Sequence, residues 1–226
     1  MKVGVLGTGT VGRTLAARLV DLDHEIALGT RDVESTMARS EPDQMGNAPL
    51  ATWAAENPAV AVHTFADAAR FGEVVVNATA GSVSIDVLTA AGADNLAGKV
   101  LLDIANPLDF SAGMPPSLFV KDTDSLGEQI QQAFPGARVV KALNTMTAAL
   151  MADPRRLAAG DHTTFVSGND ADAKQLVAGL LRSLGHTDVL DLGDITTARG
   201  AEMLLPIWLR IWGALGTPMF NVKVVR

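Results

Sequence analysis

A glycine-rich turn close to the start of the chain constrains the fold more than any other feature of the sequence. The apolar residues 3–6 lead directly into it, and its glycines are Gly7, Gly9 and Gly12. A GxGxxG pattern alone is a weak signal, but one that follows a strand and opens a helix is typical of a dinucleotide-binding βαβ unit. In such a unit Gly7 permits the tight turn, Gly9 lets a pyrophosphate approach the backbone, and Gly12 lets the helix pack against the strand. The chain is therefore predicted to bind a dinucleotide.

The same turn would provide the groups that hold the pyrophosphate. A helix that begins near Thr10 directs unpaired backbone N–H groups and the positive end of its dipole at this position, so no basic side chain is needed. Thr8 and Thr10 would add hydroxyl donors. We therefore expect the whole turn to contact the cofactor, namely Gly7, Thr8, Gly9, Thr10, Val11 and Gly12.

The end of the second predicted strand, residues 25–28, indicates which dinucleotide binds. A carboxylate here holds the ribose of NAD(H), whereas a basic residue accommodates the 2′-phosphate of NADP(H). Gly29 closes this strand and is followed by Thr30 and Arg31, a hydroxyl and a guanidinium suited to a phosphate. Asp32 leaves an alternative open, because a one-residue change of register would bring its carboxylate toward the ribose. We favour a role for Asp32 as the N-cap of a following helix, and NADP(H) over NAD(H).

Short β-branched and apolar runs alternate with stretches of helical period, which is typical of a parallel sheet covered by helices. We predict an α/β fold of Rossmann type, doubly wound and mainly parallel. Residues 1–150 would form the NADP-binding domain, and residues 151–226 a small C-terminal α/β or helical domain packed against it. The structure of residues 32–57 stays open, because turn-forming residues interrupt a short helical pattern. The predicted strands are residues 3–6, 25–28, 59–63, 74–78, 100–104, 139–143, 163–167 and 188–192, and the predicted helices are residues 11–20, 67–70, 85–91, 125–134 and 171–184.

Residues 195–220 have the three- and four-residue apolar spacing of one amphipathic helix. Trp208 and Trp212 lie on its apolar face, for which we favour a place in the core and, second, a two-fold homodimer interface. Pro206 and Arg210 interrupt the apolar stretch, so the sequence predicts no membrane span here.

The composition is that of a globular protein and excludes several classes of function. The chain carries 25 acidic and 18 basic residues, and its formal charge of −7 argues against a nucleic-acid partner. It has no cysteine, which excludes thiolate chemistry and cysteine-ligated metals and fits a reducing compartment. The four histidines have no patterned partner, so no metal site is expected. Because a predicted strand begins at once, without a signal-peptide pattern, we expect a cytoplasmic protein.

Several segments beyond the glycine turn resemble one protein family. The segments are residues 29–31, 139–145, 167–170, 191–194, 198–202, 205–206 and 220–223. They are similar to the NADP oxidoreductases that depend on the deazaflavin coenzyme F420, and also to the NADPH-binding domains of membrane metalloreductases. The resemblance implies hydride exchange between the nicotinamide of NADP(H) and the deazaflavin ring, with the protein acting by positioning the rings and excluding water. No catalytic acid or nucleophile stands out in the sequence.

The resemblance also implies which loops surround the two rings. All of them follow predicted strands, at whose carboxyl ends ligands bind in open α/β sheets. By resemblance, Thr79, Ala80 and Gly81 would lie along the nicotinamide, Ala105, Asn106 and Pro107 would form a wall, and Leu143, Asn144 and Thr145 would face the second ring.

Two positions depart from the pattern expected of the family. A second basic residue is expected shortly after the Arg31 position, to share the 2′-phosphate, whereas this chain has Glu34 and Ser35 there; Ser35 is kept among the cofactor-binding candidates. Residues 77–81 lack the family's proline and bulky aromatic, so the pocket for the second ring is altered. Two other functions therefore stay open. One is reduction of a flavin or a small carbonyl or imine compound by NADPH, and the other is NADP(H) binding by a non-enzymatic redox sensor.

Lys141 lies in the interior of the predicted strand at residues 139–143. Some dehydrogenases use a lysine as a general acid. At this position in a strand we expect instead a surface or ion-pairing role, so that loss of Lys141 would leave hydride transfer largely intact.

Overall fold

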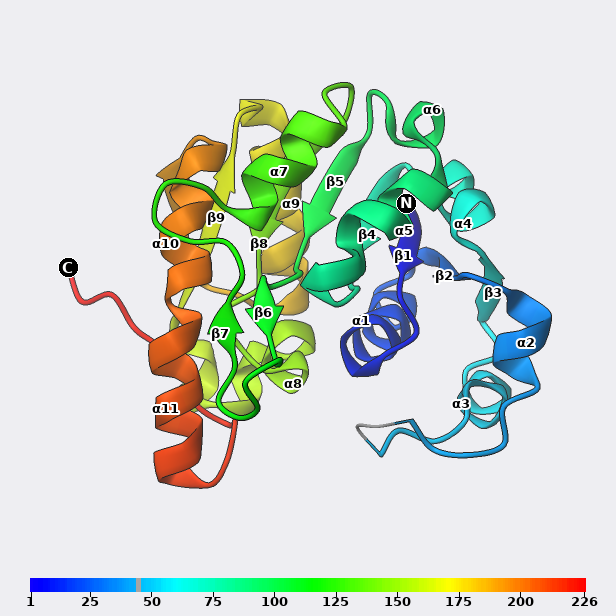
Figure 1. The fold of residues 1–226 in the computed structure, drawn as a ribbon, viewed down its shortest axis with the longest axis horizontal. Helices are drawn as coiled ribbons and strands as arrows, with labels where there is room; N and C mark the ends of the chain where they lie inside the picture. Colours follow the sequence, from blue (N-terminus) through cyan, green and yellow to red (C-terminus); the bar gives the residue numbers. More distant parts are fainter. Residues whose placement is uncertain (44–45) are drawn as a thin grey trace.

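The computed structural model describes residues 1–43 and 46–226 (Figure 1). Its eight-stranded sheet has the order β10-β9-β8-β5-β4-β1-β2-β3, and neighbouring strands are parallel except for β8 and β9. From β3 to β8 this is the order of doubly wound dinucleotide-binding sheets, which reverses between β1 and β4. The predicted fold class is therefore confirmed. The strands are β1 (Lys2–Leu6), β2 (Glu25–Thr30), β3 (Val60–Thr64), β4 (Val74–Asn77), β5 (Val100–Asp103), β8 (Arg138–Ala142), β9 (Thr163–Gly168) and β10 (Asp188–Gly193).

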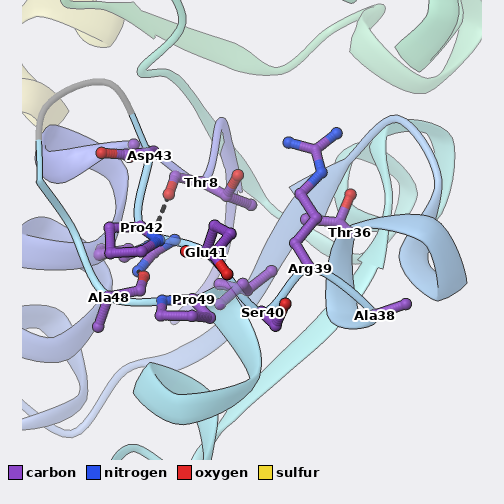
Figure 2. A pocket seen from close by; sticks show the side chains of 13 residues that line it. Thr8, Thr36, Ala38, Arg39, Ser40, Glu41, Pro42, Asp43, Ala48 and Pro49 are labelled. Carbon is purple, nitrogen blue, oxygen red and sulfur yellow. Dashed lines mark hydrogen bonds between the residues drawn. The ribbon is translucent and has the colours of Figure 1, made fainter.

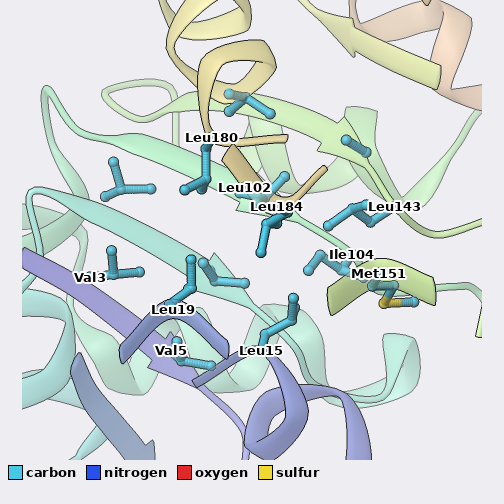
Figure 3. Close-up of a cluster of buried hydrophobic side chains, with 14 of the residues drawn as sticks. Val3, Val5, Leu15, Leu19, Leu102, Ile104, Leu143, Met151, Leu180 and Leu184 are labelled. Carbon is cyan, nitrogen blue, oxygen red and sulfur yellow. The ribbon is translucent and has the colours of Figure 1, made fainter. Parts of the chain in front are cut away.

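Helices cover both faces of this sheet. They include α1 (Thr10–Val20), α4 (Phe65–Phe71), α5 (Ser84–Ala91), α6 (Ala93–Leu96), α7 (Leu126–Ala133), α8 (Ala148–Ala152) and α9 (Ala171–Leu184). Val3 and Val5 of β1 pack into one apolar cluster with α1, α8 and α9 (Figure 3), and Leu6 packs into a second cluster with α4, α5 and α7. Successive strand residues point to opposite faces, so burial of both faces explains why the strands read as continuous apolar runs.

The segment whose structure the sequence left open contains two short helices, α2 (Val33–Met37) and α3 (Leu50–Glu56). Residues 44 and 45, within this segment, lie outside the described residues. The Asp32 side chain accepts the Ser35 backbone N–H at 2.7 Å and is the N-cap of α2. The N-cap role favoured for Asp32 is therefore confirmed.

The prediction of one continuous helix over residues 195–220 is wrong. This stretch holds a 3₁₀ turn at Ile195–Thr197 and two helices, α10 (Ala198–Met203) and α11 (Leu205–Leu215). Pro206 lies in the first turn of α11, where it lacks an N–H to continue the helix before it. Gly216, with a φ of +67°, ends α11 in the left-handed conformation. None of the helices in the described part of the chain combines the length and apolar character needed to cross a membrane.

A two-stranded hairpin, β6 (Leu108–Asp109) and β7 (Ser117–Leu118), was not predicted. Its Leu118 packs against Trp208 of α11, which is 8% exposed, so the core position favoured for this tryptophan is confirmed. Strands β9 and β10 come from the segment after residue 150 and continue the same sheet. The division into two domains at residue 150 stays a prediction.

Candidate functional site

The glycine turn connects β1 to α1 with little space around two of its glycines. Gly7 has a φ of +117°, a conformation that glycine adopts without strain. A Cβ on Gly12 would lie 1.9 Å from the Gly7 carbonyl oxygen, so a side chain there would push the helix off the turn. A Cβ on Gly9 would meet no atom within 4 Å among the described residues. Gly7 and Gly12 therefore shape the turn, and Gly9 faces open space.

The N-terminus of α1 keeps its backbone donors available. Gly9 is the N-cap, and in the described part of the chain no side chain caps the helix and no acidic residue lies in its first turn. Uncapped N–H groups together with the helix dipole attract an anion. The open space at Gly9 and the uncapped helix end fit a pyrophosphate. Thr10 has another partner, since its Oγ1 accepts from Asn47 Nδ2 at 2.8 Å.

A cavity of about 770 Å³ opens beside the glycine turn (Figure 2). Two of the predicted cofactor contacts, Thr8 and Gly9, line it. Arg13 and Arg39 also line it, and sequence reasoning missed both. The full lining is Thr8, Gly9, Arg13, Thr36, Ala38, Arg39, Ser40, Glu41, Pro42, Asp43, Ala48, Pro49 and Leu50.

Arg13 joins the glycine turn to the opposite wall of this cavity. Its Nε donates to the Thr8 carbonyl at 2.6 Å and its Nη1 to the Ala48 carbonyl at 2.5 Å. Burial lowers the pKa of Arg13, and the nearby Asp43 opposes that change. In the sequence Arg13 directly follows Gly12, the last glycine of the turn, and this position is the signal by which it could have been found.

The residues after β2 point in different directions. Thr30 is buried, and its hydroxyl lies 2.9 Å from the Thr36 hydroxyl rather than in the open. Arg31, Ser35 and Arg39 are exposed. Within residues 1–43 and 46–226, neither the Arg31 nor the Arg39 guanidinium has a hydrogen-bond or ion-pair partner. Arg39 extends from the loop after α2, across the cavity from Pro42 (Figure 2). The sequence pattern points only to positions directly after Arg31, whereas the helix α2 separates Arg39 from them and the chain after it returns to the cavity.

Two of the predicted ring-binding loops meet each other and the glycine turn. A Cβ on Gly7 would lie 2.6 Å from the Ala78 carbonyl oxygen and 3.4 Å from Thr79 Cγ2. A Cβ on Gly81 would lie 2.0 Å from the Asn106 carbonyl oxygen. The backbones therefore approach each other so closely that only glycine fits at both positions. Ala80 is exposed beside this contact, whereas Ala105 and Pro107 are buried.

The third predicted loop lies behind the second. Asn106 Nδ2 donates to the Asn144 carbonyl at 2.8 Å, and Asn144 Nδ2 donates to Asn106 Oδ1 at 3.0 Å. Leu143, Asn144 and Thr145 are at most 3% exposed, and the Leu143 side chain belongs to the main apolar core. In this conformation Asn144 supports the second loop, and the contact of the three residues with a second ring stays a prediction.

Lys141 is 1% exposed, so the surface alternative predicted for it is wrong, and the ion-pairing alternative is confirmed. Its Nζ lies 2.8 Å from Asp103 Oδ2 and 2.8 Å from Glu202 Oε1. Lys141 reaches the core because β8 lies in the middle of the sheet, where both faces are covered.

Comparisons with known proteins identify the family of this chain. The model of the family described as NADP oxidoreductase, coenzyme F420-dependent, matches residues 2–107. A crystal structure from Arthrobacter sp. FB24, provisionally named an F420-dependent NADP reductase, is 65% identical, with a TM-score of 0.96 and complete coverage of both chains. The chain belongs to the family of F420-dependent NADP oxidoreductases. It is accordingly an NADP-dependent oxidoreductase with a Rossmann-type fold.

Two curated relatives show how far the similarity to other members extends. The F420-dependent NADP reductase of Methanocaldococcus jannaschii is 26% identical over 209 residues, which cover 92% of this chain and 90% of the relative. The metalloreductase STEAP3 of Rattus norvegicus is 31% identical over 212 residues, which cover 92% of this chain. The chain spans 38% of the length of that metalloreductase, so the similarity concerns one part of the larger protein.

Proposed function

We propose that this family member binds NADP(H) across the glycine turn and exchanges a hydride between its nicotinamide and coenzyme F420. The observation that carries the proposal is the uncapped start of α1, which faces open space at Gly9 and adjoins the cavity lined by Arg39. Backbone N–H groups there would receive the pyrophosphate. The names of the curated archaeal relatives support coenzyme F420 as the second substrate.

The reaction makes modest chemical demands on the protein. When bound, NADPH supplies a hydride, which carries two electrons and one proton to the deazaflavin ring, and a proton from water completes the reduction. NADP⁺ would be the oxidised product. The chain must therefore bring two rings together and keep water away, since proximity and orientation supply much of the rate. The loops at Thr79–Gly81 and Ala105–Pro107 are proposed to hold the nicotinamide at the carboxyl edge of β4 and β5.

Arg31 and Arg39 are proposed to share the 2′-phosphate of NADP(H). Both are exposed cations without a partner in the described part of the chain, and Arg39 lines the cavity next to the turn. Guanidinium groups bind phosphate through paired N–H donors. Arg39 would then supply the second basic group that the sequence lacks at Ser35. Thr30 and Ser35 are proposed to act through the conformation of this segment, because Thr30 bonds Thr36 and Ser35 bonds Asp32.

Affinities of the Arg31→Gln and Arg39→Gln variants for NADPH and NADH test this assignment. A charge-assisted hydrogen bond is worth about 1.5–3 kcal/mol, so each variant should bind NADPH roughly ten- to a hundredfold more weakly. NADH affinity should stay unchanged, because NADH has no 2′-phosphate. Arg156→Gln, at an exposed arginine in the segment after α8, is the matched control. If a variant loses affinity for NADPH and for NADH equally, the arginine that it replaces does not bind the 2′-phosphate.

The second substrate is tested by mixing the protein with NADPH and oxidised coenzyme F420. The proposal predicts loss of the visible absorbance of the deazaflavin at the rate at which NADPH is consumed. Free flavins and small carbonyl and imine compounds serve as comparison acceptors. Faster turnover with any of them, or tight NADPH binding without turnover of the deazaflavin, would contradict the proposal.

Apolar side chains that α11 and the nearby hairpin expose support a proposed homodimer. Ile207 and Leu215 of α11 are 51% and 58% exposed, and Met114 in the hairpin loop is 69% exposed. Exposed apolar groups of this kind often mark subunit contacts. Light scattering of the purified chain would measure its mass, and a monomer at all concentrations would exclude the dimer. We also propose a cytoplasmic location, which the lack of cysteine supports.

A further inference from the structure

Three charged side chains lie together in the interior, behind the loops assigned to the nicotinamide. Lys141 on β8, Asp103 at the end of β5 and Glu202 on α10 are each at most 1% exposed. The Lys141 ammonium lies 2.8 Å from Asp103 Oδ2 and 2.8 Å from Glu202 Oε1. It also donates to the carbonyl of Ala105. Because an ammonium has three N–H donors, all of them are used.

Burial of these three charged side chains, the triad, costs free energy. Charges lose their hydration on burial, and well-packed apolar residues often replace such ion pairs without loss of stability. The triad carries a formal charge of −1, which the start of α7 offsets because the Glu202 carboxylate accepts the N–H groups of Leu126 at 2.8 Å and Gly127 at 3.0 Å. Burial alone would lower the pKa of Lys141, but Asp103 and Glu202 outweigh it and raise that pKa. Lys141 is therefore a lasting cation and donor rather than a source of protons.

Hydrogen bonds connect the triad to both nicotinamide loops. Asp103 Oδ1 accepts Asn77 Nδ2 at 2.8 Å and the backbone N–H of Ala105 at 3.2 Å. Asn77 Oδ1 in turn accepts the Thr79 hydroxyl at 2.7 Å. Lys141 thus reaches one loop directly, through the Ala105 carbonyl, and the other through Asp103 and Asn77.

The backbone just after Lys141 shows that this region is held in an unfavourable conformation. Leu143 has a φ of +64°, which a bulky side chain rarely adopts and which persists only where the surroundings enforce it. On one side of Leu143, Lys141 is bound to Glu202 of α10. On the other side, Asn144 Nδ2 donates to the Ala201 carbonyl of the same helix at 3.2 Å. Helix α10 therefore fixes the end of β8 at two neighbouring points.

We propose that Lys141 is a positioning residue for hydride transfer, an inference that rests on the proposed function. It makes no contact with the cofactor. It holds the Ala105 carbonyl and, through Asp103 and Asn77, the Thr79 hydroxyl, so that the two loops keep the spacing that orients the nicotinamide. This differs from the expectation, drawn from the sequence, that loss of Lys141 leaves hydride transfer largely intact.

The test compares the double variant Lys141→Met/Glu202→Gln with the single variant Glu202→Gln. Without Lys141, the buried carboxylates of Asp103 and Glu202 would both lose their cation, and the change Glu202→Gln removes one of these two charges. Three quantities are measured: NADPH affinity, the fluorescence anisotropy of the bound reduced nicotinamide, and kcat with coenzyme F420. We expect NADPH affinity within about threefold of that of Glu202→Gln, since the adenosine contacts lie elsewhere. The anisotropy should fall toward that of free NADPH. The value of kcat should fall about a hundredfold, because a misplacement of the reacting ring by about 1 Å can lower the rate that much.

The matched control is Lys99→Met. Lys99 also donates to a backbone carbonyl, that of Ala69 at 2.7 Å, but it precedes β5 and so lies at the opposite edge of the sheet. Its loss should leave anisotropy and kcat unchanged. Unchanged anisotropy and kcat in the Lys141 variant would overturn the proposal, as would a loss of NADPH affinity equal to the loss of kcat.

A second variant keeps the proposal testable if the double variant does not fold. Asn77→Ala leaves the triad intact and removes the bond that reaches Thr79. It should lower anisotropy and reduce kcat about tenfold at unchanged NADPH affinity, and wild-type values would overturn the proposal. The anisotropy needs no second substrate. A wild-type protein that immobilises the nicotinamide but does not reduce coenzyme F420 would therefore refute the proposed function and leave the role of Lys141 measurable.

Discussion

The two ends of the proposed cofactor site are built in opposite ways. At the adenosine end the helix start is uncapped, Gly9 faces open space, and Arg31 and Arg39 have no partner in the described part of the chain. At the nicotinamide end the polar groups of Asn77, Asp103 and their neighbours are already bonded to one another. An anion is bound tightly where donors are available, whereas a ring is oriented where the surroundings are already rigid. Changes at the first end should therefore act on affinity, and changes at the second end on rate.

The largest expected effect comes from a comparison of two glycine-to-alanine substitutions in the glycine turn. In Gly12→Ala the new Cβ would overlap the Gly7 carbonyl, 1.9 Å away, and we expect a loss of folding free energy of about 3 kcal/mol or more. Gly9→Ala meets no described atom within 4 Å, so stability should change by less than about 0.5 kcal/mol. The Gly9 variant should instead bind NADPH at least about tenfold more weakly, because its methyl group occupies the space of the pyrophosphate. Urea unfolding would measure the stability of the two variants, and NADPH titration would measure their affinity. Unchanged NADPH binding by Gly9→Ala would show that the pyrophosphate does not bind at this position.

A third region, away from both ends, should set the response to acid. His186 is 2% exposed, and burial is the main cause that lowers its pKa from 6.5 to about 4. Unfolded chains take up this proton below pH 6.5, whereas the folded protein resists it until about pH 4. Stability should therefore fall as the pH drops through that window, by about 3 kcal/mol in total. Urea unfolding of the wild type and His186→Asn at several pH values would measure the contribution, and equal pH dependence of the two would contradict it.

At the nicotinamide end, Gly81→Ala should separate rate from affinity. Its Cβ would lie 2.0 Å from the Asn106 carbonyl oxygen and would force the two loops apart. We expect kcat to fall about a hundredfold while NADPH affinity stays within about threefold. Gly179→Ala, in α9 with no described atom within 4 Å of the new Cβ, is the control for a glycine replaced without a clash. If NADPH affinity falls as far as kcat, the proposal that changes at the nicotinamide end act on rate and not on affinity is wrong.

The smallest expected effect concerns Thr10, which tests the adenosine end alone. Its hydroxyl bonds Asn47 in the structure, although the sequence predicted a phosphate contact. If the hydroxyl turns to a phosphate on binding, Thr10→Val should weaken NADPH binding by about 0.5–1.5 kcal/mol, which is roughly two- to tenfold. Calorimetry would measure this change. An unchanged affinity would show that Thr10 keeps its bond to Asn47 in the complex.

Features that depend on neighbouring residues were predictable from the sequence. The glycine turn, the apolar strands and the N-cap at Asp32 all follow from interactions within a few residues. The break between α10 and α11 also has a local cause, Pro206, and was missed because the apolar spacing continues across it. The doubly wound, mainly parallel class of the fold also followed from the alternation of strand and helix patterns, whereas the antiparallel pairing of β9 with β8 was not predicted.

What the sequence by itself determined is thus the glycine turn and the class of fold around it, whereas the binding of a 2′-phosphate by Arg31 stays a prediction. Only the tertiary structure decided that Arg39 reaches the same cavity and that Lys141 joins Asp103 and Glu202 in the core. The physical reason is that these partners come together through strand order and helix packing. Lys141 is separated from Asp103 by 38 residues, and no local spacing encodes which distant carboxylate will face it.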